Sequence, residues 1–139
     1  MSKKQRVLFL CTHNAARSQM AEALLRRVAG GRFIVQSAGS EPTEVHPLAI
    51  AAMREAGIDI RRQRAKGIDE IKNDPDIVIT LCDDAREACP LFPGAPRYLH
   101  WNLPDPSLAQ GDENARLAVF RRVRDELARL INRFFEGVE

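Results

Sequence analysis

The chain has 139 residues, of which 29% are charged, and a formal net charge of +2. This length supports a core without disulfide cross-links, and we expect residues 1–139 to form a single domain. So small a net charge gives no indication of a nucleic-acid partner, and no apolar run is long enough to suggest a membrane-spanning helix.

The amino-terminal residues combine basic side chains with a short apolar run. That run, Val7–Leu10, is much shorter than the apolar region of a secretory signal peptide, so we expect a cytoplasmic protein. Cytoplasmic thiols are kept reduced, and the three cysteines are therefore not expected to form structural disulfides. Metal binding, redox chemistry or simple burial remain as their possible roles.

The first cysteine lies between a predicted strand and a predicted helix. Cys11 follows the apolar run, Arg17 comes after five intervening residues, and apolar side chains recur at helical intervals from Ser18 onward. The free N–H groups at a helix N-terminus bind tetrahedral anions and favour a reactive thiolate. An arginine adds a planar fork for two anion oxygens. The pattern therefore predicts an oxyanion site with a nucleophile, although a buried core thiol beside an ordinary arginine is the alternative.

Strand and helix patterns alternate along the rest of the chain, which is typical of an α/β fold with a parallel sheet. With right-handed crossovers, the simplest arrangement is a small doubly wound four-stranded sheet of order 2-1-3-4, flanked by helices. The expected strands are Val7–Leu10, Phe33–Gln36, Ile77–Leu81 and Tyr98–Trp101, and the expected helices begin at Ser18, His46-Pro47, Gly67-Ile68 and about Glu113, the last reaching about Phe135.

This strand order brings two cysteines to one crevice. Cys11 closes the first strand and Cys82 follows the third, and ligands of open α/β sheets bind at the carboxyl ends of such neighbouring strands. Cys89 follows Cys82 after six residues. A helix over 82–89 would separate the two α-carbons by about 10.5 Å, whereas a disulfide allows at most about 7 Å. The segment must therefore unwind if the pair is to oxidise; zinc binding and inert burial are the alternatives, although this spacing lacks the usual close zinc pair.

An aspartate between two prolines marks the loop after the fourth strand. Asp105 lies between Pro104 and Pro106, which stiffen the backbone on both sides. Asp-Pro is also a common turn signal, so this pattern alone does not establish a catalytic role.

The residues CTHNAARSQMAE, Cys11 to Glu22, resemble the phosphate-binding loop of the low-molecular-weight tyrosine phosphatase superfamily, and the cysteine pair is similar to that of its thioredoxin-coupled arsenate reductases. The resemblance extends over essentially the whole chain and implies the same doubly wound sheet. It implies that Cys11 is the nucleophile, Asp105 the general acid, and Cys82 and Cys89 a redox shuttle. The implied oxyanion-binding residues are Thr12, His13, Asn14, Ala15, Ala16, Arg17 and Ser18.

Three loop residues carry more detailed expectations. Asn14 suits a tight bend with positive φ. The Ser18 hydroxyl can donate a hydrogen bond to the Cys11 thiolate, and His13 is expected to be structural or solvent-facing.

Some relatives bind potassium through residues that correspond to Asn14 and Glu22 and to two others near Arg64 and Lys66. Because positive charge there would repel a cation, we expect no metal site.

The function that the resemblance implies is the reduction of arsenate to arsenite by a triple-cysteine relay, without a bound cofactor. The partners would be an arsenate- or phosphate-like oxyanion and thioredoxin or a similar dithiol protein, and the chain is expected to be a monomer. Phosphomonoester hydrolysis is the alternative, but Ser107-Leu108-Ala109 follows the Asp-Pro dipeptide where phosphatases typically have aromatic residues. A non-enzymatic redox switch that responds to oxyanions is a third possibility.

Overall fold

The computed structural model describes residues 4–135, and its centre is a parallel sheet of four strands. The strand order is β2-β1-β3-β4, as predicted, and all three pairings are parallel. The strands are β1 (Gln5–Cys11), β2 (Phe33–Gly39), β3 (Ile77–Thr80) and β4 (Arg97–His100). In β1 and β3, the apolar runs are buried on both faces, as expected for central strands of a parallel sheet.

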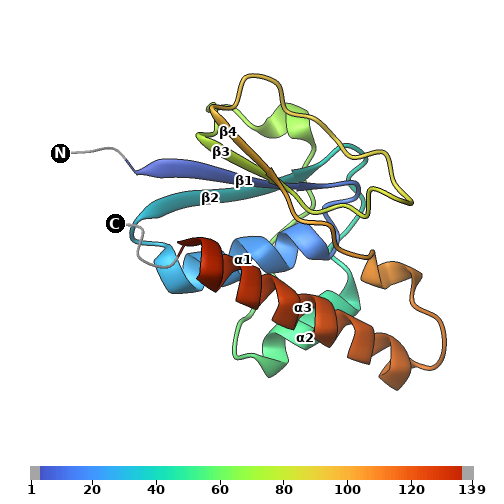
Figure 1. Ribbon diagram of the computed structural model, residues 1–139. Helices are drawn as coiled ribbons and strands as arrows, with labels where there is room; N and C mark the ends of the chain where they lie inside the picture. The colour runs from blue at the N-terminus through green and yellow to red at the C-terminus, as the bar shows by residue number, and fades with distance from the viewer. Residues whose placement is uncertain (1–3, 136–139) are drawn as a thin grey trace.

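Three α-helices cover one face of this sheet (Figure 1). They are α1 (Arg17–Ala29), α2 (Pro47–Glu55) and α3 (Glu113–Phe135). The predicted starts and the predicted end of α3 agree closely with these bounds. Local sequence explains the boundaries: His46 caps α2 by accepting the N–H of Leu48 at 3.0 Å, and Gly57 follows that helix with φ +80°.

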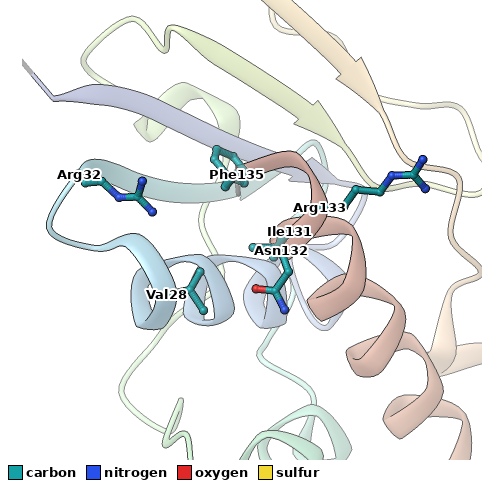
Figure 2. A pocket seen from close by; sticks show the side chains of 6 residues that line it. All are labelled: Val28, Arg32, Ile131, Asn132, Arg133 and Phe135. Atoms are coloured by element: carbon teal, nitrogen blue, oxygen red, sulfur yellow. The ribbon is translucent and has the colours of Figure 1, made fainter. Parts of the chain in front are cut away.

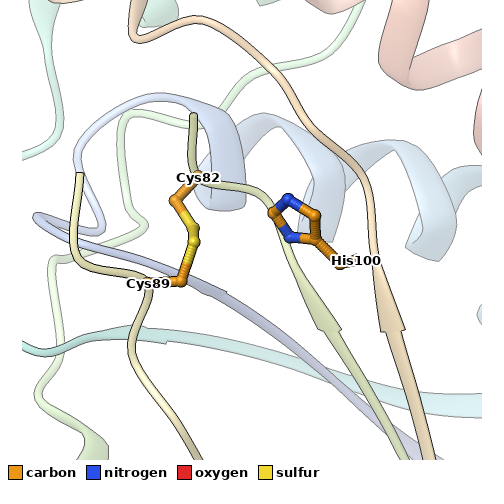
Figure 3. Close-up of side chains that lie close together, drawn as sticks. All are labelled: Cys82, Cys89 and His100. Atoms are coloured by element: carbon orange, nitrogen blue, oxygen red, sulfur yellow. A yellow bond between two sulfur atoms is a disulfide. The ribbon is translucent and has the colours of Figure 1, made fainter. Parts of the chain in front are cut away.

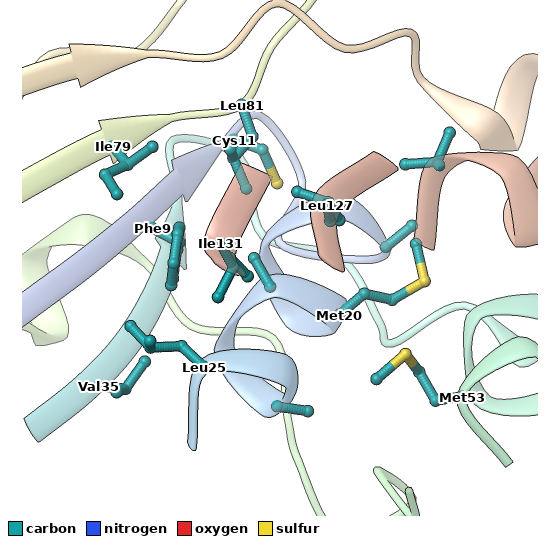
Figure 4. Close-up of a cluster of buried hydrophobic side chains, with 14 of the residues drawn as sticks. Phe9, Cys11, Met20, Leu25, Val35, Met53, Ile79, Leu81, Leu127 and Ile131 are labelled. Atoms are coloured by element: carbon teal, nitrogen blue, oxygen red, sulfur yellow. The ribbon is translucent and has the colours of Figure 1, made fainter. Parts of the chain in front are cut away.

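The main core lies between the sheet and these helices (Figure 4). Helix α3 contributes a stripe of buried residues at intervals of three and four, namely Phe120, Val123, Leu127, Ile131 and Phe135. Phe9 of β1 and Met20 of α1 are fully buried against it. None of the helices described in residues 4–135 is both long enough and apolar enough to cross a bilayer.

The opposite face of the sheet departs from the prediction. The helix expected from Gly67-Ile68 is wrong: the structure has only one 3-10 turn, η1 (Ile68–Glu70). The polar stretch Lys72–Asp74 has no apolar periodicity, and Pro75 cannot continue a helix. Irregular segments cover the small core on this face, in which Ile68, Ile71, Phe92 and Ala95 pack against Leu8, Leu10, Ala38 and Val78.

A hollow between α1 and α3 lies at the amino ends of the strands (Figure 2). It includes Val28, Arg32 and Phe135, and the Phe135 ring packs edge-to-face against Phe33 at the start of β2, with ring centroids 5.0 Å apart. Cys11 ends β1 at the opposite side, where the carboxyl ends of the strands lie. The hollow is therefore remote from the predicted site.

Candidate functional site: a thiol and arginine loop beside a disulfide

The loop between β1 and α1 presents a set of free amide donors. Within the described residues, none of the backbone N–H groups of residues 13–16 donates a hydrogen bond to a protein acceptor. They precede the first turn of a 13-residue helix, so the positive end of its dipole adds to their effect. This arrangement can bind a tetrahedral anion, as predicted from the loop sequence.

A buried asparagine holds the loop in shape. Asn14 has φ +51°, the positive value expected for the bend, and its side chain is fully buried. Its Oδ1 accepts the backbone N–H of Lys66 at 2.8 Å, and this contact fixes the orientation of the amide. Its Nδ2 therefore faces two hydroxyls, Ser18 Oγ at 2.7 Å and Ser37 Oγ at 3.0 Å.

The predicted serine contact to the thiol is present. Ser18 Oγ lies 2.8 Å from Cys11 Sγ, and both residues are buried. Because Asn14 donates to the same oxygen, the hydroxyl hydrogen of Ser18 is available to the sulfur. Such a hydrogen bond stabilises a thiolate. His13 also behaves as predicted, since its ring Nδ1 lies 3.0 Å from the backbone oxygen of Glu41 and its role is structural.

The close approach of β2 to the loop requires a glycine that the sequence analysis did not single out. A Cβ at Gly39 would lie 2.6 Å from the Thr12 carbonyl oxygen and 2.8 Å from the Asn14 nitrogen. A side chain there would displace the loop backbone. The sequence does show a glycine just after the second predicted strand. Its role follows only from the pairing of Cys11 with Gly39, which the sequence patterns did not give.

At the position that would correspond to a potassium site, the negative charge of Glu22 is already balanced by basic side chains. Glu22 forms ion pairs with Arg26 and, at 3.7 Å, with Lys66 Nζ, and its Oε1 accepts a hydrogen bond from Ser37 Oγ at 2.5 Å. An additional cation would face these two basic groups. The residues present therefore do not fit a bound potassium ion.

The predicted catalytic aspartate lies beside the arginine fork. Asp105 Oδ2 is 3.8 Å from Arg17 Nη2, and its side chain is only 13% exposed. Its Oδ1 accepts hydrogen bonds from the N–H of Ser107 at 2.9 Å and from the Ser107 hydroxyl at 2.7 Å. These bonds orient the carboxyl group and leave Oδ2 directed to the site.

The cysteine pair is present as a disulfide. Cys82 and Cys89 are bonded, with their α-carbons 5.8 Å apart (Figure 3). Residues 82–89 form turns and bends, which agrees with the prediction that a helix and this disulfide cannot coexist. Cys82 is fully buried, whereas Cys89 is partly exposed.

A histidine completes a cluster around this disulfide. Ligand atoms of Cys82, Cys89 and His100 lie within 4.8 Å of one another, and the His100 ring Nδ1 is 2.7 Å from Thr80 Oγ1. Disulfide sulfurs are not thiolates, which are the form that binds metals. In this oxidised form the donor set does not fit a zinc ion.

Glu87, which the sequence analysis did not single out, forms three hydrogen bonds with residues of the site. Its carboxylate takes two hydrogen bonds from Arg17, at 2.5 Å from Nη1 and 2.8 Å from Nη2, and one from the Thr12 hydroxyl at 2.7 Å. Burial alone would raise the pKa of Glu87, but the hydrogen bonds from Arg17, the Asp83 N–H and Thr12 outweigh it and lower the pKa to about 2. The carboxylate is therefore charged at neutral pH.

Comparison with known proteins agrees with this geometry. Residues 6–139 match the family of low molecular weight phosphotyrosine protein phosphatases. The chain is 47% identical to an arsenate reductase of Bacillus licheniformis, over 100% of both chains.

Solved structures show the same relationship. An arsenate reductase in its oxidised state is 33% identical, with a TM-score of 0.81 and coverage of 97% of this chain and 99% of that chain. A thioredoxin-dependent arsenate reductase of Corynebacterium glutamicum is also 33% identical, with a TM-score of 0.70, and the match covers 98% of this chain and 62% of that longer chain. The chain belongs to the low molecular weight phosphotyrosine protein phosphatase family, on the branch formed by its arsenate reductase relatives.

Proposed function

We propose that this protein reduces arsenate to arsenite through three cysteines and is regenerated by thioredoxin or a similar dithiol protein. The observation that carries this proposal is the Cys82–Cys89 disulfide at the carboxyl edge of β3, next to the strand that ends at Cys11. A phosphatase needs only the thiol, the arginine and the acid. A second and a third cysteine, placed so that they can bond, provide the two electrons that arsenate reduction requires.

The first step uses the loop. The amides of residues 13–16 and the Arg17 fork hold arsenate, and the Cys11 thiolate attacks arsenic. Asp105 donates a proton to the departing oxygen, which leaves as water. The product of this step is a Cys11–arsenate thioester-like adduct with arsenic still in its higher oxidation state.

The relay then moves two electrons to arsenic. The Cys82 thiolate attacks the Cys11 sulfur, the sulfur–arsenic bond breaks, and its electron pair leaves with arsenite. Cys89 next attacks Cys82, which forms the Cys82–Cys89 disulfide and frees the Cys11 thiolate. Of the two oxidised sulfurs, that of Cys89 belongs to the more exposed residue, so thioredoxin attacks there.

The surroundings of the loop also favour a small inorganic substrate. A hollow beside the loop is bounded by His13, Thr43, His46 and Ser107, among other residues, and none of the residues that line it is phenylalanine, tyrosine or tryptophan. A phosphotyrosine ring would gain little stacking there. Phosphate ester hydrolysis is thus a side activity of the same loop in this proposal.

The direct test is a reconstituted assay with thioredoxin, thioredoxin reductase and NADPH. Arsenate should produce NADPH consumption over many turnovers with one arsenite formed per NADPH, whereas a phosphate ester should produce none. A Cys82→Ser variant provides the matched control, because it should lose arsenate-dependent NADPH consumption and still hydrolyse p-nitrophenyl phosphate. Phosphatase turnover without arsenate reduction in the wild type would refute the proposal.

The proposed acid gives a second test. Asp105→Asn should slow arsenate-dependent chemistry and phosphate ester hydrolysis by about two to four orders of magnitude, the range for a positioned proton donor. The asparagine oxygen can still accept the N–H of Ser107, so the loop should keep its shape. Single-turnover rates at several pH values measure the effect.

Ser107→Ala is the control. It removes one hydrogen bond to the Asp105 carboxyl group but leaves that proposed proton donor in place, and it should lower the rate by about tenfold or less. Equal rates for wild type and Asp105→Asn would leave Asp105 a turn residue.

A further inference from the structure

Glu87 binds Arg17, the arginine that is expected to bind the oxyanion. Its two carboxylate oxygens face the two terminal nitrogens of Arg17, which is the fork-to-fork geometry by which arginine also binds arsenate or phosphate oxygens. The Arg17 side chain is 3% exposed and that of Glu87 is 14% exposed, so water does not separate the pair. The Thr12 hydroxyl, at the start of the loop, completes the site for the carboxylate.

In this arrangement the fork formed by the two terminal nitrogens of Arg17 is already bound to Glu87. Its Nη1 also donates to the Leu103 carbonyl oxygen at 3.1 Å, and Asp105 Oδ2 lies 3.8 Å from its Nη2. An arriving dianion would meet two carboxylates and a single guanidinium that is already bound. The loop amides of residues 13–16 remain unpaired. The amide donors of the oxyanion site are thus free to bind an anion, whereas its arginine is bound to a carboxylate of the same chain.

The disulfide sets the position of Glu87. Glu87 lies inside the loop that the Cys82–Cys89 bond closes, two residues before Cys89. Within this loop the Asp83 carbonyl oxygen accepts the N–H of Glu87 at 2.8 Å, and the Asp83 N–H donates to Glu87 Oε1 at 2.9 Å. A helical course of residues 82–89 would separate the cysteine α-carbons by about 10.5 Å instead of the observed 5.8 Å. Reduction removes the only covalent constraint that holds the segment in its present turn.

We propose that Glu87 is an internal carboxylate ligand of the oxyanion site, which binds Arg17 when Cys82 and Cys89 are bonded and leaves it when they are reduced. This inference rests on the proposed function, because it assigns an order to the catalytic cycle. The oxidised enzyme excludes arsenate and phosphate until thioredoxin has acted. An oxyanion is therefore disfavoured in the site while the Cys82 and Cys89 thiols that complete its reduction are unavailable.

Thermodynamic linkage gives the proposal a second consequence. If oxyanions bind the reduced form more tightly, they must stabilise that form and raise the reduction potential of the disulfide. For a two-electron couple, each tenfold difference in affinity corresponds to about 30 mV. The coupling should disappear when the carboxylate is removed.

The test measures inorganic phosphate binding by isothermal titration calorimetry to oxidised and reduced protein, without turnover. Oxidised wild type should bind phosphate about 5- to 150-fold more weakly than reduced wild type, the usual range for coupled sites. Glu87→Gln should remove most of this difference by strengthening binding to the oxidised form, and Glu87→Ala, which also removes the remaining amide acceptor, should remove at least as much. Redox titrations with and without phosphate should show the corresponding shift in wild type and its loss in both variants.

Glu41→Gln is the matched control. It removes the same charge from an exposed residue near the loop, and its side chain does not contact Arg17. Wild-type behaviour of Glu41→Gln supports the proposal. Equal phosphate affinity of oxidised wild type and both Glu87 variants, with folding verified by circular dichroism, would overturn it. Because binding is measured without catalysis, this result does not depend on whether the chain reduces arsenate, which the NADPH assay decides separately.

Discussion

Cys11→Ser is expected to abolish both arsenate reduction and phosphate ester hydrolysis, with a loss of at least about four orders of magnitude in rate. The serine hydroxyl stays protonated at neutral pH, and within residues 4–135 no imidazole or carboxylate is hydrogen-bonded to the side chain of residue 11 to remove its proton. The hydrogen bond to the sulfur comes from Ser18, whose hydroxyl stabilises a thiolate but cannot act as a base. Steady-state assays with arsenate and with p-nitrophenyl phosphate measure the loss.

A graded control separates loss of the nucleophile from damage to the loop. Ser18→Ala keeps the thiol and removes its hydrogen bond, and should reduce both rates by about 10- to 150-fold, the value of one hydrogen bond to a charged group. Reduced Cys11→Ser should still bind phosphate, since Arg17 and the amides of residues 13–16 are unchanged. Near-normal turnover of Cys11→Ser with either substrate would contradict the assignment of Cys11 as nucleophile.

The parts of the site that the sequence predicted are those encoded within short segments. Cys11, Asn14, Arg17 and Ser18 lie on eight consecutive residues, so a strand, a bend and a helix start in that order already bring them close together. The strand order also followed from local patterns, because right-handed crossovers leave few arrangements of four strands. The strand order came from periodicity and the handedness of crossovers, whereas the roles of the loop residues also drew on the resemblance to the phosphatase superfamily.

The parts that the sequence did not predict depend on contacts between distant segments. Arg17 and Glu87 are 70 residues apart, and no spacing rule connects them. The ion pair of Glu22 with Lys66 joins residues that are also far apart in the sequence, and the sequence patterns did not predict it; the segment after β2 brings Lys66 to the loop. The failed helix at Ile68 shows a related limit, since a short apolar pattern before Pro75 gave too little periodicity to distinguish a helix from a single turn.

These distant contacts join the redox segment to the oxyanion loop. Glu87 and Cys82 lie on the same closed segment, and the first contacts Arg17 while the second lies at the end of the strand beside β1. A change in the bonding of Cys82 therefore reaches the arginine through only a few residues. We therefore expect the bonding of the cysteines to affect oxyanion binding through this segment.

The relay provides the sharpest prediction for the cysteine pair. Cys89→Ser should release one arsenite per protein molecule and then stop, with Cys11 bonded to Cys82, because no thiol remains to move the oxidation outward. The register places the two residues near each other at the carboxyl ends of adjacent parallel strands: Leu10 pairs with Thr80, so Cys11 lies one residue beyond this pair and Cys82 two residues beyond it. Strands of one sheet are about 4.8 Å apart, within the range that a disulfide bridges. Single-turnover arsenite release and mass spectrometry of the trapped disulfide measure both outcomes.

Cys82→Ser should stop one step earlier, with arsenic still bound to Cys11 and no arsenite released. The reason is that no thiolate at position 82 can attack the Cys11 sulfur and break the sulfur–arsenic bond. Both variants should hydrolyse p-nitrophenyl phosphate at near wild-type rates, because that reaction uses neither Cys82 nor Cys89. Multiple turnovers of Cys89→Ser with thioredoxin, or an oxidised wild type that lacks the Cys82–Cys89 bond, would refute the relay. In the relay, Cys82 must attack the buried sulfur of Cys11, and Cys89 must make the resulting Cys82–Cys89 disulfide accessible to thioredoxin; the burial of Cys82 and the partial exposure of Cys89 match those two tasks.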